Sequence, residues 1–293
     1  SGSSWTSWME NQLDEGVSYF QYRGFYGVSG FDNGDIDDVN NGHKLPFATV
    51  LTCGTGSFAE ESTCLSEKFL RAGSASNPRG AIAAVCTATG NTHTMFNNII
   101  AMGIYDGLFP KNLGTAGAAL ANGKVTLFSA YPTNPYHWVD AFTQWNSLMG
   151  DPATHLWTDT PTVLSVIHPL VLSFGTNFVD IAVYDEDENP VEDAMITLLM
   201  GDDIIFTSGY TDEAGLLTMN LDYVSNGTIS ITVTKQNCKP YENTIILHSD
   251  GAVVNLDNEL DVQIHDDDDG VINPGEQFGL SIPIKNYGTE NVY

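Results

Sequence analysis

The stretch Leu45-Pro-Phe-Ala-Thr-Val-Leu-Thr-Cys-Gly-Thr-Gly-Ser-Phe58 decides the fold. Residues Phe47 to Leu51 form a short apolar run containing Val and Thr, which is typical of a strand buried on both faces of a parallel sheet. The run ends in Cys53-Gly54-Thr55-Gly56, where the glycines permit a sharp turn and leave room for a ligand. Open α/β sheets place their chemistry at the carboxyl ends of strands, so Cys53 is a candidate functional residue. The alternative is an inert buried thiol, because free Cys packs as a small hydrophobe.

Composition limits the classes of function. The chain has 293 residues and 42% apolar content, enough for two or three domains with real cores. Its net charge is −27, from 10 Lys and Arg against 37 Asp and Glu. That charge excludes a general nucleic-acid binder, which needs a basic surface, and argues against docking onto anionic lipid. No apolar run reaches membrane-spanning length. The four cysteines show neither metal-ligand spacing nor a disulfide framework.

Further motifs accompany the cysteine. They are Cys64-Leu-Ser-Glu-Lys-Phe-Leu-Arg-Ala72, Gly80-Ala-Ile-Ala-Ala-Val85 and Leu148-Met-Gly-Asp-Pro152. Together with Thr52 to Phe58 they resemble, in order and spacing, the gingipain-type cysteine peptidases over roughly residues 17–157. The resemblance implies a caspase-like α/β fold, a mostly parallel sheet flanked by helices, with a Cys–His pair at its carboxyl edge. It also implies a protein or peptide substrate and immunoglobulin-like domains after the catalytic domain.

This sequence departs from the family's pattern at the position of the general base. The family's strand ends in Gly-His-Gly, whereas this chain has Gly24-Phe25-Tyr26-Gly27. Phenylalanine cannot accept a proton, and we expect Phe25 to be a packing residue. Backbone N–H groups of Gly24 and Gly54 are candidates for cradling an oxyanion.

His93 is the candidate replacement for the missing base. It lies just past the predicted strand 80–88 and should leave the sheet at the same edge as Cys53. The alternative is a histidine at the start of a helix or in a loop that is hydrogen-bonded to the backbone. His43 starts at the opposite end of the Cys53 strand and is interpreted as a solvated loop residue. Catalysis requires a Cys53 sulfur exposed at the rim of the sheet and a histidine nitrogen that can come within about 4 Å of it, if necessary through a rotamer change. A disulfide between Cys53 and Cys64 would abolish the nucleophile.

The periodicity of the chain predicts its elements and domains. Helices are expected over 3–13, 64–72, 96–109, 115–130 and 135–148, and further strands over 17–22 and 155–157, in a first domain spanning residues 1–158. Short strands are then expected at 178–184, 194–200, 204–208, 215–221 and 228–235. Residues 162–248 resemble an immunoglobulin-like or carboxypeptidase-regulatory-like β-sandwich. Residues 249–293 are interpreted as the beginning of another, incomplete β-sandwich-like domain.

Two acidic runs raise the question of metal. Phe31 to Asp38 fits a solvated turn or a calcium loop. In the run from Asp266 to Glu276, the candidate calcium ligands are Asp266, Asp268, Asn273 and Glu276. Adjacent like charges repel unless a cation neutralises them, yet an unliganded acidic turn fits equally well. We therefore expect no required cofactor, and a structural calcium ion is left open.

Two functions remain after these observations. The first is a secreted or cell-surface cysteine endopeptidase that uses Cys53 and His93. The second, favoured by Phe25, is a catalytically inactive peptidase-like protein with a structural or adhesive role at the cell surface. The family resemblance also implies a first half of the catalytic domain before Ser1, and a partner chain is the alternative source of a missing histidine.

Overall fold

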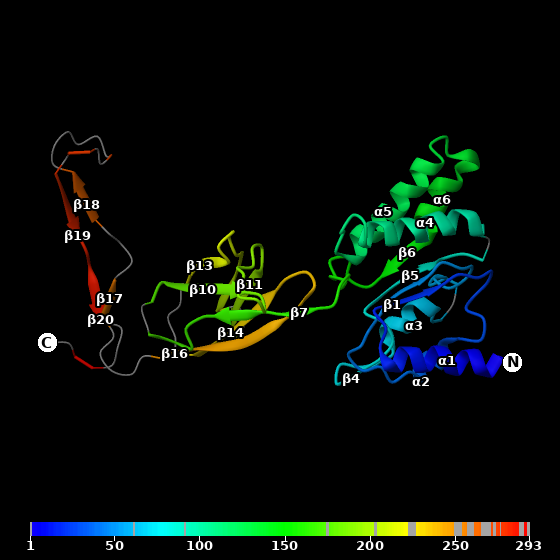
Figure 1. Ribbon diagram of the computed structural model, residues 1–293, viewed down its shortest axis with the longest axis horizontal. Helices are drawn as coiled ribbons and strands as arrows, with labels where there is room; N and C mark the ends of the chain where they lie inside the picture. Colours follow the sequence, from blue (N-terminus) through cyan, green and yellow to red (C-terminus); the bar gives the residue numbers. More distant parts are fainter. Residues whose placement is uncertain are drawn as a thin grey trace. The chain divides into compact units, whose positions relative to one another are not determined.

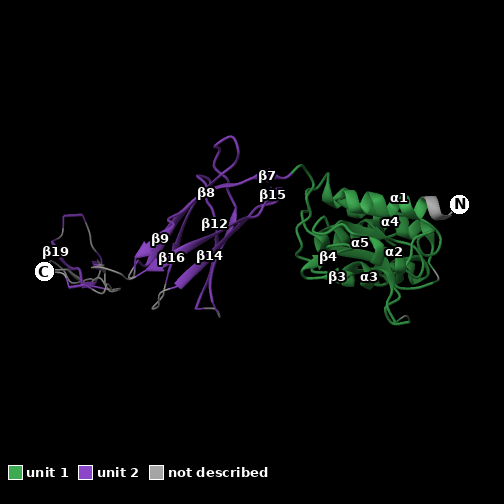
Figure 2. Ribbon diagram, turned by 90° about the horizontal axis from the view of Figure 1, so that it is seen from below, with its two compact units in different colours: residues 1–160 green, residues 161–293 purple. Residues whose placement is uncertain are grey.

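The structure is a computed structural model. It describes residues 2–60, 62–90, 92–173, 176–201, 204–221, 227–248, 254–256, 261–264, 271, 274–275, 277–286 and 290–291. The chain forms two compact units, Ser1–Thr160 and Pro161–Tyr293, which Figure 2 colours separately. The candidate calcium ligands Asp266, Asp268, Asn273 and Glu276 lie outside the described residues, so that site stays a prediction.

The first unit alternates helices with short strands. Its helices are α1 (Gly2–Glu15), α2 (Asn33–Asp38), α3 (Leu65–Arg71), α4 (Thr94–Leu108), α5 (Ala116–Ala130), the 3-10 helix η1 (Pro135–His137) and α6 (Trp138–Trp145). Its strands are β1 (Tyr19–Tyr22), β2 (Phe47–Val50), β5 (Ala83–Thr87) and β6 (Asn146–Met149), with a small hairpin of β3 (Gly73–Ser74) and β4 (Asn77–Pro78). Among the described residues, none of the helices combines the length and the apolar character that a membrane span requires.

The central sheet has the order β1-β2-β5-β6. Strands β1, β2 and β5 are parallel, and β6 pairs antiparallel with β5. The register places Tyr22 beside Val50 and Val50 beside Cys86. The three parallel strands therefore end level with one another, and the loops that follow them leave the sheet at one edge.

Helices cover both faces of this sheet (Figure 1). Successive residues of β5 enter opposite cores, as the period of two in a strand requires. Ala84 and Cys86 pack with residues of α1, α2 and α3, whereas Ala83 and Val85 pack with residues of α4, α5 and α6. The central strands are thus buried on both faces, which confirms the interpretation of the apolar run at Phe47.

Three local predictions for the first unit are wrong. The expected helix over 135–148 stops at Trp145, because Asn146 to Met149 pair with β5 as strand β6. The acidic run is not a turn, because Asn33 to Asp38 form helix α2, which Asp32 caps in a capping box with Asp35. The expected strand at 155–157 is reduced to one bridge, between Thr115 and His155.

The second unit consists of strands in its described part. They are β7 (Thr162–Val163), β8 (Ser165–Ile167), β9 (Val171–Ser173), β10 (Phe178–Tyr184), β11 (Met195–Met200), β12 (Ile205–Tyr210), β13 (Leu216–Asn220), β14 (Gly227–Thr234), β15 (Cys238–Lys239), β16 (Tyr241–His248), β17 (Val254–Leu256), β18 (Asp261–Ile264), β19 (Phe278–Ser281) and β20 (Ile284–Asn286).

Two sheets of the second unit, ordered β13-β10-β8 and β12-β11-β14-β16-β9, share one apolar core. The remaining strands form the pairs β15-β7, β17-β20 and β18-β19. Strands β10 to β14 lie where the alternating pattern predicts them. The assignment of residues 162–248 to an immunoglobulin-like family stays a prediction, as does a separate domain over 249–293.

Gly80 at the start of the β5 segment gives a stability test. Its φ is +87°, and a Cβ there would lie 2.2 Å from the Phe69 carbonyl oxygen. We expect Gly80→Ala to lower the free energy of unfolding by more than about 2 kcal/mol, because the backbone must shift to relieve the clash. Urea unfolding followed by tryptophan fluorescence measures this in the first unit alone, since all 5 Trp residues lie before residue 160.

Gly90→Ala is the matched control, because a Cβ at Gly90 meets nothing within 4 Å. Equal unfolding midpoints for the two variants would contradict the tight approach of Gly80 to Phe69.

Candidate functional site

The loops after β1, β2 and β5 meet at one edge of the sheet. Tyr26 forms a parallel bridge with Cys53, and the Gly27 N–H donates to the Cys53 carbonyl at 3.0 Å. On the other side, the Gly54 N–H donates to the Thr89 carbonyl at 2.8 Å. Cys53 therefore lies between the Phe25 loop and the loop that leads to His93, which is the edge that the sequence predicts.

The expectation of an exposed sulfur is wrong for this conformation. Cys53 is only 4% exposed. Its neighbour Gly54 has φ +77°, and a Cβ at Gly54 would lie 3.1 Å from Tyr26 Cζ, so the tyrosine ring covers the turn after the thiol. All four cysteines are free, which excludes the disulfide between Cys53 and Cys64. The thiol is not consumed by a disulfide, but a substrate or reagent can reach it only after the side chains that cover it have moved.

A threonine hydroxyl is the polar partner of the thiol. Cys53 Sγ lies 2.8 Å from Thr92 Oγ1. The Asn97 side-chain amide, from the first turns of α4, donates to Thr92 Oγ1 at 3.3 Å and to the Leu51 carbonyl at 3.2 Å. Asn146 in turn donates to Asn97 Oδ1 at 3.2 Å. A hydrogen-bonded chain thus runs from the thiol through Thr92 to the buried Asn97 and Asn146.

This series of hydrogen bonds orients the thiol but cannot take its proton. Asn97 uses one lone pair of Thr92 Oγ1, and the hydroxyl can still donate to the sulfur or accept from it. A threonine hydroxyl is not basic near neutral pH, so Thr92 can stabilise a thiolate by donation but cannot create one. Sequence reasoning missed Thr92, Asn97 and Asn146. The one available signal was polar Asn97 inside an otherwise apolar helical stretch.

His93 lies one residue beyond the partner of the thiol. It is the N-cap of α4, and its Nδ1 accepts the Met95 N–H at 3.2 Å. Its ring is exposed and meets the edge of Phe96. In the described part of the chain, no hydrogen bond joins His93 to Cys53. The structure therefore brings His93 to the predicted edge of the sheet but shows it there as a helix cap, with its role as a base still a prediction.

Phe25 occupies the position opposite Cys53 without packing into the fold. Its carbonyl oxygen accepts the Cys53 N–H at 3.4 Å. The side chain is 81% exposed, so the expectation of a packing residue is wrong. The Gly54 N–H already donates to Thr89, so its predicted oxyanion role requires that bond to open. Gly24, next to Phe25, stays a predicted donor.

A cleft of about 470 Å³ borders the turn after the thiol. It is lined by residues that include Tyr26, Gly54, Thr55, Asp32 and Leu65. These residues come from the loops after β1 and β2 and from the α2 and α3 side of the sheet. The cleft is wide enough to receive a side chain of a bound peptide.

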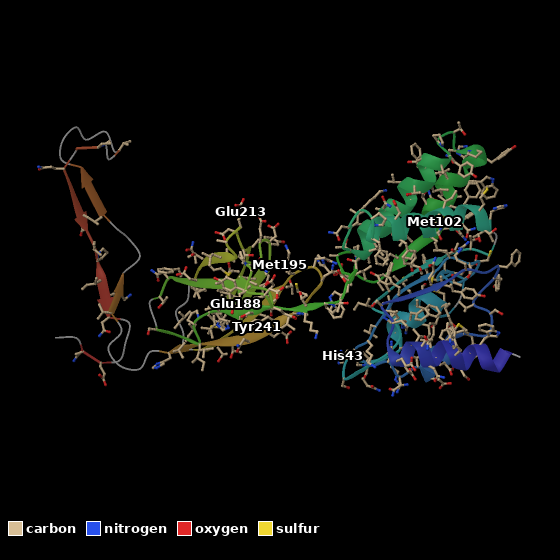
Figure 3. The ribbon with its side chains drawn as sticks, viewed as in Figure 1. His43, Met102, Glu188, Met195, Glu213 and Tyr241 are labelled. Atoms are coloured by element: carbon tan, nitrogen blue, oxygen red, sulfur yellow. The ribbon has the colours of Figure 1, made fainter. Side chains whose placement is uncertain are left out.

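His43 and His155 lie at a different place. They line a cavity of about 630 Å³ together with residues that include Tyr19 and Trp157. Figure 3 labels His43, in the loop that precedes β2. The Tyr19 hydroxyl donates to the Trp157 carbonyl at 2.7 Å, and burial raises the pKa of Tyr19 to about 12. This cavity adjoins the amino end of β2, which confirms that His43 is far from the thiol edge.

The buried thiols give a test of the site assignment. Burial raises the pKa of Cys86 to about 12, so this thiol stays protonated and unreactive in the folded protein well above pH 9. We expect iodoacetamide at pH 8 to modify Cys53 several-fold faster than Cys64 or Cys86, and peptide mass spectrometry measures the order. Faster modification of Cys64 or Cys86 would contradict the assignment.

Comparisons with known proteins agree with this geometry. The model of peptidase family C25 matches residues 3–157. Gingipain R2 of Porphyromonas gingivalis is 24% identical over 235 residues, which cover 76% of this chain and 30% of that protein. Gingipain R1 of the same organism is 24% identical over 244 residues, covering 78% of this chain and 23% of that protein. The chain thus spans less than a third of the length of these curated relatives.

Solved structures give the same fold. The crystal structure of the Arg-specific cysteine proteinase gingipain R has a TM-score of 0.69 at 19% identity, over 83% of this chain and 56% of that chain. The complex of the Porphyromonas gingivalis RgpB pro- and mature domains has a TM-score of 0.69 at 20% identity, over 83% and 57%. These likenesses show that the first unit has the caspase-like α/β fold of the gingipains.

Proposed function

The chain belongs to peptidase family C25, and on that premise we propose that it is a secreted or cell-surface cysteine peptidase with Cys53 as nucleophile and His93 as base. One observation carries the proposal. The Cys53 sulfur lies at the carboxyl end of β2 and contacts Thr92, the residue directly before His93. The proposal requires a rearrangement of the loop that carries Thr92 and His93, so that the imidazole reaches the thiol.

The reaction follows from these two groups. His93 takes the Cys53 proton, and the thiolate attacks the peptide carbonyl carbon. The tetrahedral oxyanion is held by backbone N–H groups, for which Gly24 and Gly54 are the candidates. Collapse breaks the C–N bond, His93 gives its proton to the leaving amine, and a thioester remains. Water, deprotonated by His93, then attacks the thioester, releasing the acid and restoring the thiol.

His93 is favoured over the other described histidines by location. His43 and His155 line the cavity at the opposite end of β2, and His137 is bonded to Asp140. Two further described histidines, 168 and 248, belong to the second unit. For His93 to act, its Nδ1 must release the Met95 N–H, and its exposed ring leaves room for that rotation.

A second candidate function is a catalytically inactive peptidase-like protein with a structural or adhesive role at the cell surface. The observation that favours it is Phe25, which stands exposed beside Cys53 where the resemblance calls for the base. In that case the cleft bordered by Tyr26 and Gly54 still binds a peptide, and the thiol takes no part in chemistry.

The remaining expectations extend the proposal. Residues 162–248 would be an immunoglobulin-like spacer, and residues 249–293 the beginning of another β-domain. A structural calcium ion is proposed for the acidic run that contains Asp266.

The two catalytic residues are tested by substitution. We expect Cys53→Ala to abolish cleavage of fluorescein-labelled casein. His93→Asn should lower the rate about 10²- to 10⁴-fold, the usual contribution of a general base. Asparagine retains an N-cap acceptor for the Met95 N–H, so this variant keeps the helix and loses the base. Cys238→Ala, in the second unit, is the control and should cleave normally; unchanged activity in His93→Asn would refute the assigned base.

Phe25→His separates the two candidate functions. If the site lacks only its base, this variant should gain casein hydrolysis over an inactive wild type, because position 25 adjoins Cys53 through the backbone. If His93 already serves as the base, wild type is active and Phe25→His changes the rate little. A gain of more than about tenfold over an active wild type would show that His93 is not the working base.

A further inference from the structure

Arg23 is held beside the thiol by three uncharged acceptors. Its Nε donates to Asn98 Oδ1 at 2.8 Å, one terminal nitrogen donates to the Thr94 carbonyl at 3.1 Å, and the other donates to the Leu51 carbonyl. These acceptors belong to α4 and to the segment directly before Cys53. The guanidinium therefore joins the three segments that form the site.

In the described part of the chain, the charge of this guanidinium has no counter-ion. Among the residues that the structure describes, the ion pairs are Lys68–Asp37, Lys111–Asp106 and His137–Asp140, and none includes Arg23. Burial lowers the pKa of Arg23. Desolvating a cation without an anionic partner costs free energy, and that cost is unusual in a chain with 37 acidic residues and 10 basic ones.

We propose that Arg23 binds the carboxylate of an acidic substrate residue next to the cleaved bond. Three of its five N–H donors are used by the fold, which leaves two on a partly exposed side chain. A planar guanidinium with two free N–H groups is the preferred partner of a carboxylate. The inference rests on the proposed function, because it names the substrate class of the same site.

The spacing fits a residue that adjoins the scissile bond. Arg23 is anchored at the Leu51 carbonyl, two residues before the nucleophile, and at the Thr94 carbonyl, two residues after the Thr92 partner of the thiol. The guanidinium is thus held by both segments that flank Cys53, which is where the proposal places the Asp or Glu side chain of the substrate. It binds on the α4 side of Cys53, whereas the cleft that contains Asp32 lies on the α2 and α3 side.

The strong negative charge of the chain does not prevent this recognition. At physiological ionic strength the Debye length is about 8 Å, so distant surface carboxylates are screened from the substrate. A direct contact inside the site is screened much less. Local pairing with Arg23 therefore decides the preference, while the overall charge reduces the association rate at low salt.

The test is a set of quenched-fluorescent peptides that differ by one Asp or Asn at each position around the cleaved bond. We expect wild type to cleave the best Asp peptide with a kcat/KM about ten- to a hundredfold above its Asn counterpart, as a charge-assisted hydrogen bond implies. Arg23→Met should lose this ratio, and Arg23→Lys should retain part of it. Arg71→Met, at an exposed arginine of α3, should keep it.

The inference is overturned if Arg23→Met keeps the wild-type ratio of kcat/KM for the Asp and Asn peptides. Tryptophan fluorescence must show that the unfolding of this variant is unchanged. If wild type cleaves no peptide at all, the proposed activity fails separately. In that case, fluorescence anisotropy with the same labelled peptides and the Cys53→Ala protein measures whether Arg23 contributes to binding of the Asp peptide. Binding about tenfold tighter to the Asp peptide, lost on adding Arg23→Met, supports the inference, and equal affinities for Asp and Asn overturn it.

Discussion

The level register of three parallel strands is the constraint on which the site depends. Tyr22, Val50 and Cys86 lie side by side, so β1, β2 and β5 end together. Each strand then contributes one loop to the same edge of the sheet. Because side chains alternate along a strand, a slip of one residue in β2 would exchange its two buried faces. The register of β2, set by packing on both faces of the sheet, therefore places Cys53 at this edge.

The resting site shows a thiol that is oriented but not activated. Thr92 and Asn97 give it hydrogen-bond partners, and Tyr26 covers the turn beside it. A buried polar chain of this kind fixes one geometry, because each unmet hydrogen bond costs free energy. In the proposed mechanism, activation requires that His93 leave its helix cap and that the side chains covering the thiol move. The proposed function thus combines a thiol in a fixed geometry with a candidate base at an exposed helix start.

Local sequence patterns predicted the elements, and tertiary contacts decided the details. The apolar run at Phe47 and the glycines after Cys53 were sufficient to predict the central strand and the edge that bears the site. The contact of Cys53 with Thr92 was not predictable, because it depends on the path of the loop after β5 across 39 residues of separation. Asn146 continues the helical pattern of its neighbours, yet pairing with β5 makes it the start of a strand. The exposure of Phe25 likewise could not be predicted, because nothing in the sequence around it distinguishes an exposed phenylalanine from a buried one.

The rate of Cys53 alkylation tests the central claim, that the thiol at this edge is deprotonated by His93. Rates are measured with iodoacetamide at neutral pH by peptide mass spectrometry in wild type and in His93→Asn. The account predicts that Cys53 reacts several-fold more slowly in His93→Asn, because the thiolate is the reactive form and this variant lacks the base that generates it. Equal rates in the two proteins would contradict it.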